Sequence, residues 1–444
     1  MYILKSKEEI LSWVEEKNKN LKVVINKKNI LETNWFLDED GVIRNKDNTF
    51  FQIKGIKRYN YSNNIIEEQP ILIQDEIGYL GIICKEFNGI MFFLMQAKIE
   101  PGNVNKIQIS PTIQATKSNF TQKHGGKKPA YIEYFLNSDR YKVLVDQIQS
   151  EQSSRFLGKR NRNIIVSVDE DIEVLSSHMW MTLKQIKELM KIDNLVNMDT
   201  RTVLSCIPYL SLTDDEKKSI GYPKSNELKK SLYEGDGLNH ITQIYHYIND
   251  YKMFDDDKKE IISLNKMQNW KWKGDEFCHK DRYHFKVIFC EMEIEGREVK
   301  KWTQPLFEAV GKAVFGLITC IEDDMLKFLV KAVPEIGCFD KIELAPTIQL
   351  EAGYEYDELN YIDKLFFDRW KNKNGVIFDT ILSEEGGRFY HEQNHNVILN
   401  VNKDDIRYLP DNYFWVDYKT LVELIKINNV LNIQLRNLLS VLEA

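Results

Sequence analysis

The chain of 444 residues is long enough for two or three domains. Its 43% hydrophobic and 29% charged residues indicate a globular protein, and its net charge of −7 argues against a general nucleic-acid binder. No stretch approaches the ~18 consecutive apolar residues of a membrane span, and the first residues lack the pattern of a signal peptide. Six scattered cysteines without a CxxC pair fit reduced thiols. We therefore expect a cytoplasmic protein with no nucleic-acid or membrane partner.

The predicted elements of the first half are a helix, several strands and a closing helix. The letters EEILSWVEE at 8–16 predict an amphipathic helix, which precedes an Asn-Trp turn at 34–35. A closing helix is predicted at 183–190, because apolar residues recur there at helical spacing. Between them, runs rich in aromatic and β-branched residues predict strands at 50–56, 78–84, 90–98 and 163–168.

The same order of elements recurs in the second half of the chain. Aligning residues 69–114 with 304–349 without a gap gives 15 identities in 46 positions. So long a period indicates a duplicated domain rather than a solenoid. We place the repeats at 1–209 and 236–444, joined by a charged connecting segment at 210–235. The predicted fold is α+β, with two copies of one mixed-sheet domain packed together.

Four long phrases lie in the first repeat: QAKIEPGN at 96–103, ISPTIQATKSN at 109–119, YIEYF at 131–135 and RNRNIIV at 160–166. Through these phrases, and over essentially its whole length, the chain resembles the nucleotide-hexose 2,3-dehydratase family. One departure from the family pattern is visible. The aromatic residue expected two positions before a Gln-Pro pair is Trp302 in the second repeat but Glu67 in the first.

The resemblance implies two Nudix-like halves, a homodimer and the substrate dTDP-4-keto-6-deoxyglucose. Loss of its C2 hydroxyl would give a 3,4-diketo-2,6-dideoxy sugar nucleotide, and a separate NADPH-dependent 3-ketoreductase would act on this unstable product. Neither half contains a Nudix box, so magnesium-dependent pyrophosphate hydrolysis is not expected. The elimination needs only proton transfers and no GxGxxG follows a strand, so we expect no cofactor. The alternative is a non-catalytic nucleotide-sugar-binding protein on the same duplicated fold.

Elimination from a 4-keto sugar needs a base for the C3 proton, donors for the C4 oxygen and an acid for the departing C2 oxygen. The candidates are Lys98, Glu100, His124 and Tyr134. Lys98 would donate to the C4 oxygen or simply form an ion pair with Glu100. His124 has a suitable unperturbed pKa, but it also reads as an ordinary loop residue before Gly-Gly. The sequence does not separate base from acid.

Comparison of the two repeats helps to select functional residues, because polar residues present in only one copy are better candidates for substrate binding or catalysis. Lys98 aligns with Val333, and the first repeat is therefore predicted to hold the active site. The second would keep the fold, with at most a vestigial pocket. Arg160 and Arg162 present fork-shaped donors suited to a diphosphate, or form a solvated basic loop. The predicted substrate-binding residues are Thr112, Gln114, Lys117, Ser118, Asn119, Thr121, Arg155, Lys159, Arg160, Arg162, Asn163 and Trp302.

A metal site is not expected. Cys278, His279 and His284 lie close together in the sequence, but their spacing matches no standard zinc pattern. Strand alternation would also send Cys278 and His279 to opposite faces.

Overall fold

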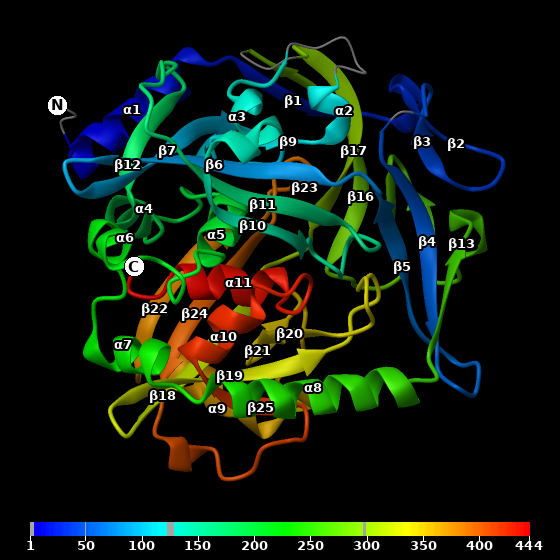
Figure 1. Cartoon of the computed structure of the whole chain (residues 1–444). Helices are drawn as coiled ribbons and strands as arrows, with labels where there is room; N and C mark the ends of the chain where they lie inside the picture. The colour runs from blue at the N-terminus through cyan, green and yellow to red at the C-terminus, as the bar shows by residue number, and fades with distance from the viewer. Residues whose placement is uncertain (1–3, 49, 122–127, 296–298) are drawn as a thin grey trace.

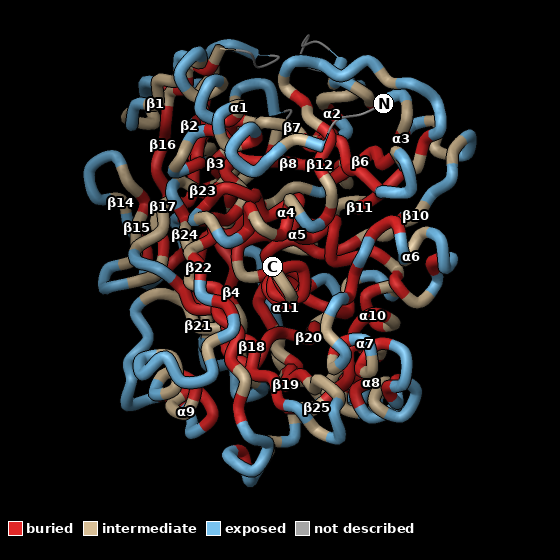
Figure 2. Tube along the Cα trace, turned by 90° about the vertical axis from the view of Figure 1, so that its left-hand side faces the viewer, coloured by how far each residue is buried: buried red, intermediate tan, exposed pale blue. Residues whose placement is uncertain are grey.

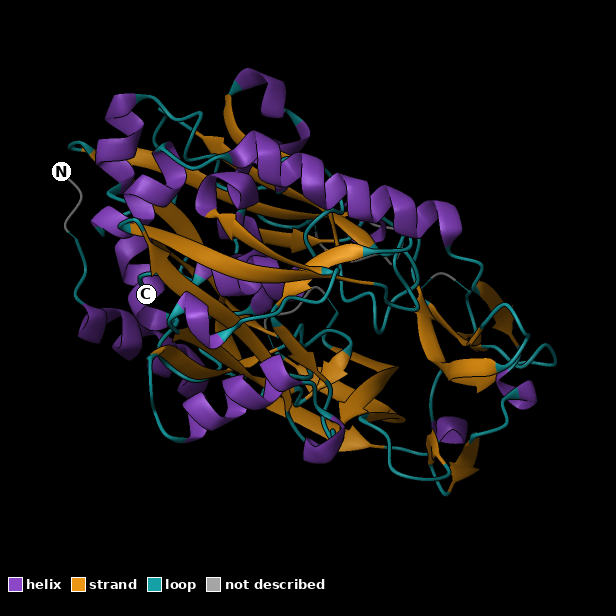
Figure 3. Cartoon of the chain, turned by 90° about the horizontal axis from the view of Figure 1, so that it is seen from below, coloured by secondary structure: helices purple, strands orange, loops and turns teal. Residues whose placement is uncertain are grey.

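The computed structural model describes residues 4–48, 50–121, 128–295 and 299–444. Over these residues the fold is α+β, with four β-sheets and helices packed around and between them (Figure 1). Seen from below, the strands fill the interior and most helices lie along the outside (Figure 3). No helix in the described part of the chain is long and apolar enough to cross a membrane.

The helices and strands come in two matching series. The first series is α1 (Lys7–Asn20), β1 (Val23–Lys27), β2 (Trp35–Leu37), β3 (Ile43–Asn45), β4 (Gln52–Tyr59), β5 (Ile65–Ile73), β6 (Gly78–Phe87), β7 (Ile90–Ile99), β8 (Ile107–Ser110), β9 (Ile113–Ala115), α2 (Lys117–Phe120), α3 (Ile132–Leu136), β10 (Lys142–Ser150), β11 (Arg160–Ser167), β12 (His178–Thr182), α4 (Leu183–Leu189) and α5 (Met198–Ser205).

Two connecting helices follow, α6 (Asp214–Ile220) and α7 (Asn226–Tyr233). The second series is α8 (Gly237–Phe254), β13 (Lys258–Ile262), β14 (Trp270–Lys273), β15 (Glu276–His279), β16 (Phe285–Ile294), β17 (Lys301–Ala309), β18 (Ala313–Glu322), β19 (Met325–Val333), β20 (Glu343–Pro346), β21 (Ile348–Leu350), α9 (Tyr361–Lys371), β22 (Val376–Ser383), β23 (Phe389–Tyr390), β24 (Gln393–Asn400), β25 (Tyr413–Asp417), α10 (Tyr418–Leu424) and α11 (Ile433–Ser440).

Each repeat contributes one large mixed sheet. In the first, the order is β10-β11-β6-β7-β12, with β11 parallel to β6; in the second, it is β22-β24-β18-β19-β25, with β24 parallel to β18. Alternate side chains of β6 pack against α3 on one face and α5 on the other. A Cβ on Gly81 would lie 2.4 Å from the ring of Phe135 on α3. The repeat-shared Gly81 is therefore a close-packing position.

The two smaller sheets exchange their first strands between the repeats. Strand β1 of the first repeat pairs with β16 of the second, whereas β13 of the second pairs with β4 of the first. A boundary between 209 and 236 therefore separates the repeats in sequence but not in space. One apolar core contains residues of both repeats, including residues of α5 and α11, which pack against each other. Figure 2 shows buried segments running through the middle of the molecule, with exposed segments mostly at its periphery.

Candidate active site

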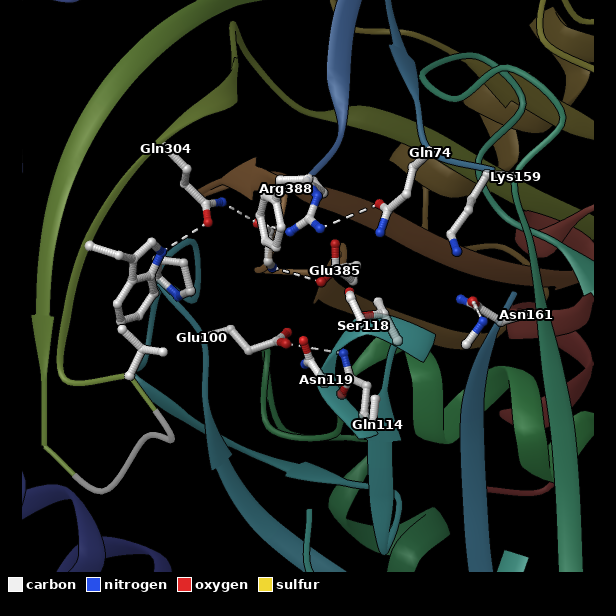
Figure 4. A pocket seen from close by; sticks show the side chains of 18 of the residues that line it. Gln74, Glu100, Gln114, Ser118, Asn119, Lys159, Asn161, Gln304, Glu385 and Arg388 are labelled. Atoms are coloured by element: carbon white, nitrogen blue, oxygen red, sulfur yellow. Dashed lines mark hydrogen bonds between the residues drawn. The ribbon is translucent and has the colours of Figure 1, made fainter. Parts of the chain in front are cut away.

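A cavity of about 650 Å³ lies where the two repeats meet. The first repeat supplies side chains that follow β7, lie on β9 and begin α2, while the second supplies part of β17 and the turn before β23. Figure 4 shows side chains from these separate elements pointing into the same space. The cavity is thus shared between the repeats rather than confined to the first.

A backbone contact between the repeats brings the two walls together. The N–H of Gly102, in the EPGN phrase, donates to the carbonyl of Gly386 at 2.7 Å. A Cβ on Gly102 would lie 1.6 Å from the carbonyl oxygen of Phe389. Only glycine permits so close an approach of two backbones. The same contact occurs in the opposite direction, since the N–H of Gly337 donates to the carbonyl of Ser153 at 2.8 Å.

Lys98 and Glu100 face the cavity as an ion pair. The Lys98 Nζ lies 3.3 Å from Glu100 Oε1 and also donates to the carbonyl of Gln114 at 3.3 Å. The Gln114 side chain donates to Glu100 Oε1 at 3.0 Å, and the Asn197 side chain donates to Gln114 Oε1 at 3.3 Å. Both readings of Lys98 remain compatible with this geometry, because the ion pair itself lines the cavity.

Five carboxyl groups line the cavity: Asp47 and a cluster of Glu100, Glu151, Asp199 and Glu385. Both carboxyl oxygens of Asp199 and one of Glu151 are buried without a hydrogen-bond partner among the described residues. Burial, reinforced by the neighbouring carboxylates, raises the pKa of Asp199 well above its ordinary value and that of Glu385 to about 7. Burial likewise raises the pKa of Glu151. Because neighbouring like charges in a buried site oppose ionisation, Glu151, Asp199 and Glu385 hold their protons to a higher pH than exposed carboxyls do.

Basic groups lie beside these carboxyls. Burial lowers the pKa of Lys159 to about 8 although Glu151 opposes the shift, and the Lys159 amine donates to the carbonyl of Glu76. The guanidinium of Arg388 lies over the rings of Phe50 and Phe51, at 5.0 and 4.3 Å, and donates to Gln74 Oε1 at 3.3 Å. Lys301 also lines the cavity.

Neutral donors and an aromatic side chain complete the walls. The Asn161 side chain donates to Glu151 Oε1 at 2.5 Å, and Ser118 donates to Glu76 through both its N–H and its hydroxyl. The indole N–H of Trp302 donates to Gln304 Oε1 at 2.9 Å. Trp302 therefore has one edge fixed while the side chain lines the cavity.

The structure brings together only some of the residues selected from the sequence. Those that line the cavity are Lys98, Glu100, Gln114, Ser118, Asn119, Lys159 and Trp302. Those that the structure places outside its lining are Thr112, Lys117, Thr121, Tyr134, Arg155, Arg160, Arg162 and Asn163. His124 lies outside the described residues.

The residues outside the lining have other contacts. Thr112 accepts a hydrogen bond from the N–H of Ile83 and donates to the carbonyl of Leu94, thereby linking β6 to β7. Tyr134 packs against Tyr131 and Tyr141. The arginines of the RNRN phrase are also engaged. Arg162 makes two 2.6 Å hydrogen bonds to Asp146, and Arg160 lies 3.9 Å from the ring centre of Phe339.

Arg155 belongs to the counterpart of this site in the second repeat. Its guanidinium lies 2.9 Å from Glu351 and 3.6 Å from Glu392. Although burial opposes the shift, Arg155 holds the pKa of Glu351 at about 2. In the counterpart site, the Arg155 guanidinium is thus held by two glutamates. In the cavity, the residues that align with Glu351 and Glu392 are Thr116 and Lys159.

Sequence reasoning missed Glu151, Asp199, Glu385 and Arg388. Asp199 aligns with Gln434, so it is a carboxyl unique to the first repeat, and the comparison of the repeats already contained this signal. Glu385 aligns with Gln152 in the register that pairs Arg155 with Arg388, and it stands out only when polar residues unique to the second repeat are also considered. Arg388 aligns with Arg155, and the sequence alone does not indicate which arginine faces a cavity.

Known proteins match this chain along most of its length. A family profile for NDP-hexose 2,3-dehydratase matches residues 7–207 and 241–442. The chain is similar to three proteins named dTDP-4-dehydro-6-deoxy-α-D-glucopyranose 2,3-dehydratase. It is 38% identical to that of Saccharopolyspora spinosa (90% of this chain, 83% of the relative), 36% to that of Streptomyces violaceoruber (91% and 90%) and 34% to that of Amycolatopsis orientalis (92% and 84%). The chain belongs to the NDP-hexose 2,3-dehydratase family.

Proposed function

We propose that the protein catalyses the 2,3-dehydration of dTDP-4-keto-6-deoxyglucose, giving a 3,4-diketo-2,6-dideoxy sugar nucleotide. The observation that carries this proposal is the joint presence of Lys98 and a carboxyl cluster in one cavity between the repeats. The names of the relatives supply the substrate.

The cavity residues fit the steps of this elimination. Removal of the C3 proton places negative charge on the C4 oxygen, and the Lys98 ammonium is a donor suited to that charge. Glu100, paired with Lys98 at 3.3 Å, is the carboxylate placed to accept the C3 proton. The C2–O bond then breaks, and the enol that results becomes the 3,4-diketone. Every step is a proton transfer or a bond cleavage within the sugar, so the reaction requires no redox cofactor.

The charges along the walls orient the nucleotide. The carboxyl cluster repels a diphosphate, so the uncharged sugar lies against Glu100 while the diphosphate lies toward Arg388 and Lys301. Ser118 and Asn119 add donors from the start of α2. Trp302 offers a ring face on which the base can stack. In this arrangement both repeats contribute to binding, although the proton-transfer groups Lys98 and Glu100 come from the first.

Three further proposals concern architecture and context. We propose that each repeat is Nudix-like, which is supported by a mixed sheet with helices on both faces. We propose that the chain forms a homodimer in the cytoplasm, where its six cysteines remain free thiols. A separate NADPH-dependent 3-ketoreductase is the reaction class that would consume the unstable diketone.

The experiment that tests the proposed function is mass spectrometry of dTDP-4-keto-6-deoxyglucose incubated with the purified protein and trapped with borohydride. No nicotinamide or metal is added, and a parallel sample contains a chelator. We expect loss of one water from the substrate in both samples. Unchanged substrate that nonetheless raises the Tm of the protein would contradict dehydration and favour a nucleotide-sugar-binding protein.

A further inference from the structure

Glu385 is a cavity carboxyl that comes from the second repeat rather than the first. It lies in the turn between β22 and β23 of the second repeat, yet it lines the cavity with Lys98 and Glu100 (Figure 4). Its Oε1 accepts a hydrogen bond from the N–H of Gly387 at 2.8 Å. One carboxyl oxygen is thus fixed by its own turn, which orients the group.

Tight backbone packing fixes this turn relative to Glu100. Gly386, next to Glu385, accepts the hydrogen bond from Gly102, two residues after Glu100. A Cβ on Gly386 would lie 2.2 Å from Asn103 Oδ1 and 3.0 Å from the Cβ of Glu100. The two turns have no room to slide, so Glu100 and Glu385 are held as neighbours across the repeat boundary.

The surroundings of the two carboxyls assign the proton. Glu100 lies 3.3 Å from the Lys98 ammonium and accepts a hydrogen bond from Gln114. Glu385 instead accepts from the N–H of Gly387, and burial together with the charge of Glu100 raises the pKa of Glu385 to about 7. Glu385 is therefore the carboxyl of this pair that we take as the proton donor.

The counterpart site has the same architecture but lacks this carboxyl. Gln152 stands where Glu385 stands, and its amide donates to Glu384, the counterpart of Glu151. The Glu100 counterpart, Glu335, keeps its hydrogen bond from Gln349 at 2.9 Å. The fold thus accepts glutamine at this turn, whereas an amide cannot supply a proton.

We propose that Glu385, contributed by the second repeat, is the catalytic acid that protonates the C2 hydroxyl as it leaves. This inference rests on the proposed dehydration. Glu100 takes the C3 proton, and the C3–H electron pair forms the enolate with its charge on the C4 oxygen. When the C4 carbonyl re-forms, a C2–C3 double bond forms and the C2–O bond breaks, and the Glu385 proton completes a water molecule. Glu385 is left as a carboxylate and Glu100 as an acid, and solvent restores both, so no oxidant or reductant is needed.

Glu385→Gln is the variant that tests this role, because a glutamine, Gln152, already occupies the equivalent turn of the first repeat, at the counterpart site. The substrate is incubated with the variant in D₂O, and three quantities are measured: water loss by mass spectrometry, deuterium entry at C3 by NMR, and Tm with and without substrate. We expect water loss to fall by about 10²- to 10⁴-fold while C3 exchange continues. Glu392→Gln, the same substitution in the counterpart site, should leave both rates unchanged.

The other outcomes are decisive in different ways. Water loss at the wild-type rate would exclude Glu385 as the acid. Loss of both water elimination and C3 exchange in a folded variant would make it the base instead and overturn the assignment. If Glu385→Gln does not fold, Glu385→Asp is measured instead, because its shorter side chain keeps the carboxyl but moves it away from the substrate. A wild-type rate of water loss in Glu385→Asp would also overturn the proposal. A wild-type protein that neither exchanges nor eliminates would instead refute the proposed function.

Discussion

The cavity and its counterpart in the second repeat share a scaffold but treat charge in opposite ways. In both, a glutamate accepts from a glutamine that in turn accepts from an asparagine: Glu100, Gln114 and Asn197 in one, Glu335, Gln349 and Asn432 in the other. In the cavity, one carboxyl oxygen of Glu151 and both of Asp199 lack partners among the described residues. In the counterpart one oxygen of Glu392 also lacks a hydrogen bond, but there Arg155 is paired with both Glu351 and Glu392.

This difference shows where the molecule tolerates unfavourable burial. An unpaired buried carboxyl costs stability, so a carboxyl without a function is expected to be replaced in one of two duplicated sites. The counterpart site has Gln152 in place of Glu385, Gln434 in place of Asp199 and Val333 in place of Lys98. The glutamate–glutamine–asparagine triad is common to both sites, so it does not by itself distinguish them. The groups found in one site only, Lys98 and Glu385, are those that we assign to chemistry together with Glu100.

The largest expected effect comes from Lys98→Val, which gives the cavity the residue that the counterpart site has at this position. The variant should fold, because Val333 occupies the equivalent position, but it lacks the donor for the C4 oxygen. We expect kcat/KM for dehydration to fall by about 10²- to 10³-fold. Lys271→Val, on the exposed side of β14, serves as the control and should be unaffected. Full activity of Lys98→Val would show that the ion pair with Glu100 is structural.

Arg155→Ala should reveal the second site as a stability element. Removing the guanidinium leaves Glu351 and Glu392 buried without their cation, which we expect to lower the free energy of unfolding by about 3–5 kcal/mol. Denaturant unfolding followed by circular dichroism measures this loss. Arg155→Met, which restores apolar volume but not charge, separates packing from pairing. A stable Arg155→Ala variant with weakened substrate binding would reverse our assignment of the two sites.

Arg388→Ala should have the complementary effect on ligand binding. Because Arg388 lines the cavity, its loss should weaken binding of the nucleotide sugar by about 10- to 100-fold, as measured by calorimetry. Arg162→Ala is the matched comparison, since the sequence favoured Arg162 for the diphosphate but the structure pairs it with Asp146. We expect little change in affinity there, and none in His395→Ala, at the position of the second repeat that aligns with Arg162. Equal losses in Arg162→Ala and Arg388→Ala would place the diphosphate differently.

The smallest effect concerns pH and the carboxyls of the counterpart site. Burial raises the pKa of Glu335 and of Glu392 to about 8. Their ordinary pKa is near 4.3, so between these values the folded protein binds more protons than the unfolded chain, and stability falls as pH rises from about 4 to 8. Glu335→Gln should flatten this part of the curve of Tm against pH. A slope identical to that of the wild type would contradict protonation of Glu335 in the folded state.

Local sequence patterns predicted the elements around the site well. The helix expected at 8–16 lies within α1, the strand expected at 90–98 lies within β7, and the closing helix begins at Leu183 as predicted but ends one residue earlier, at Leu189. These elements follow from side-chain periodicity, which short-range geometry imposes. The exchange of β1 and β13 between the small sheets was not predictable in this way, because each strand pairs with a partner more than 190 residues away.

The sequence by itself determined the duplication, the family and those cavity-lining residues that lie in its continuous phrases, such as Lys98, Glu100 and Ser118. Those residues are carried by neighbouring strands and turns, so their proximity follows from local order. Only the tertiary structure decided that Glu385 and Arg388 join them and that Arg155 does not. The reason is physical: which charges are paired, buried or open to a cavity depends on backbone contacts between the repeats, and Gly102 and Gly386 meet only after both repeats have folded.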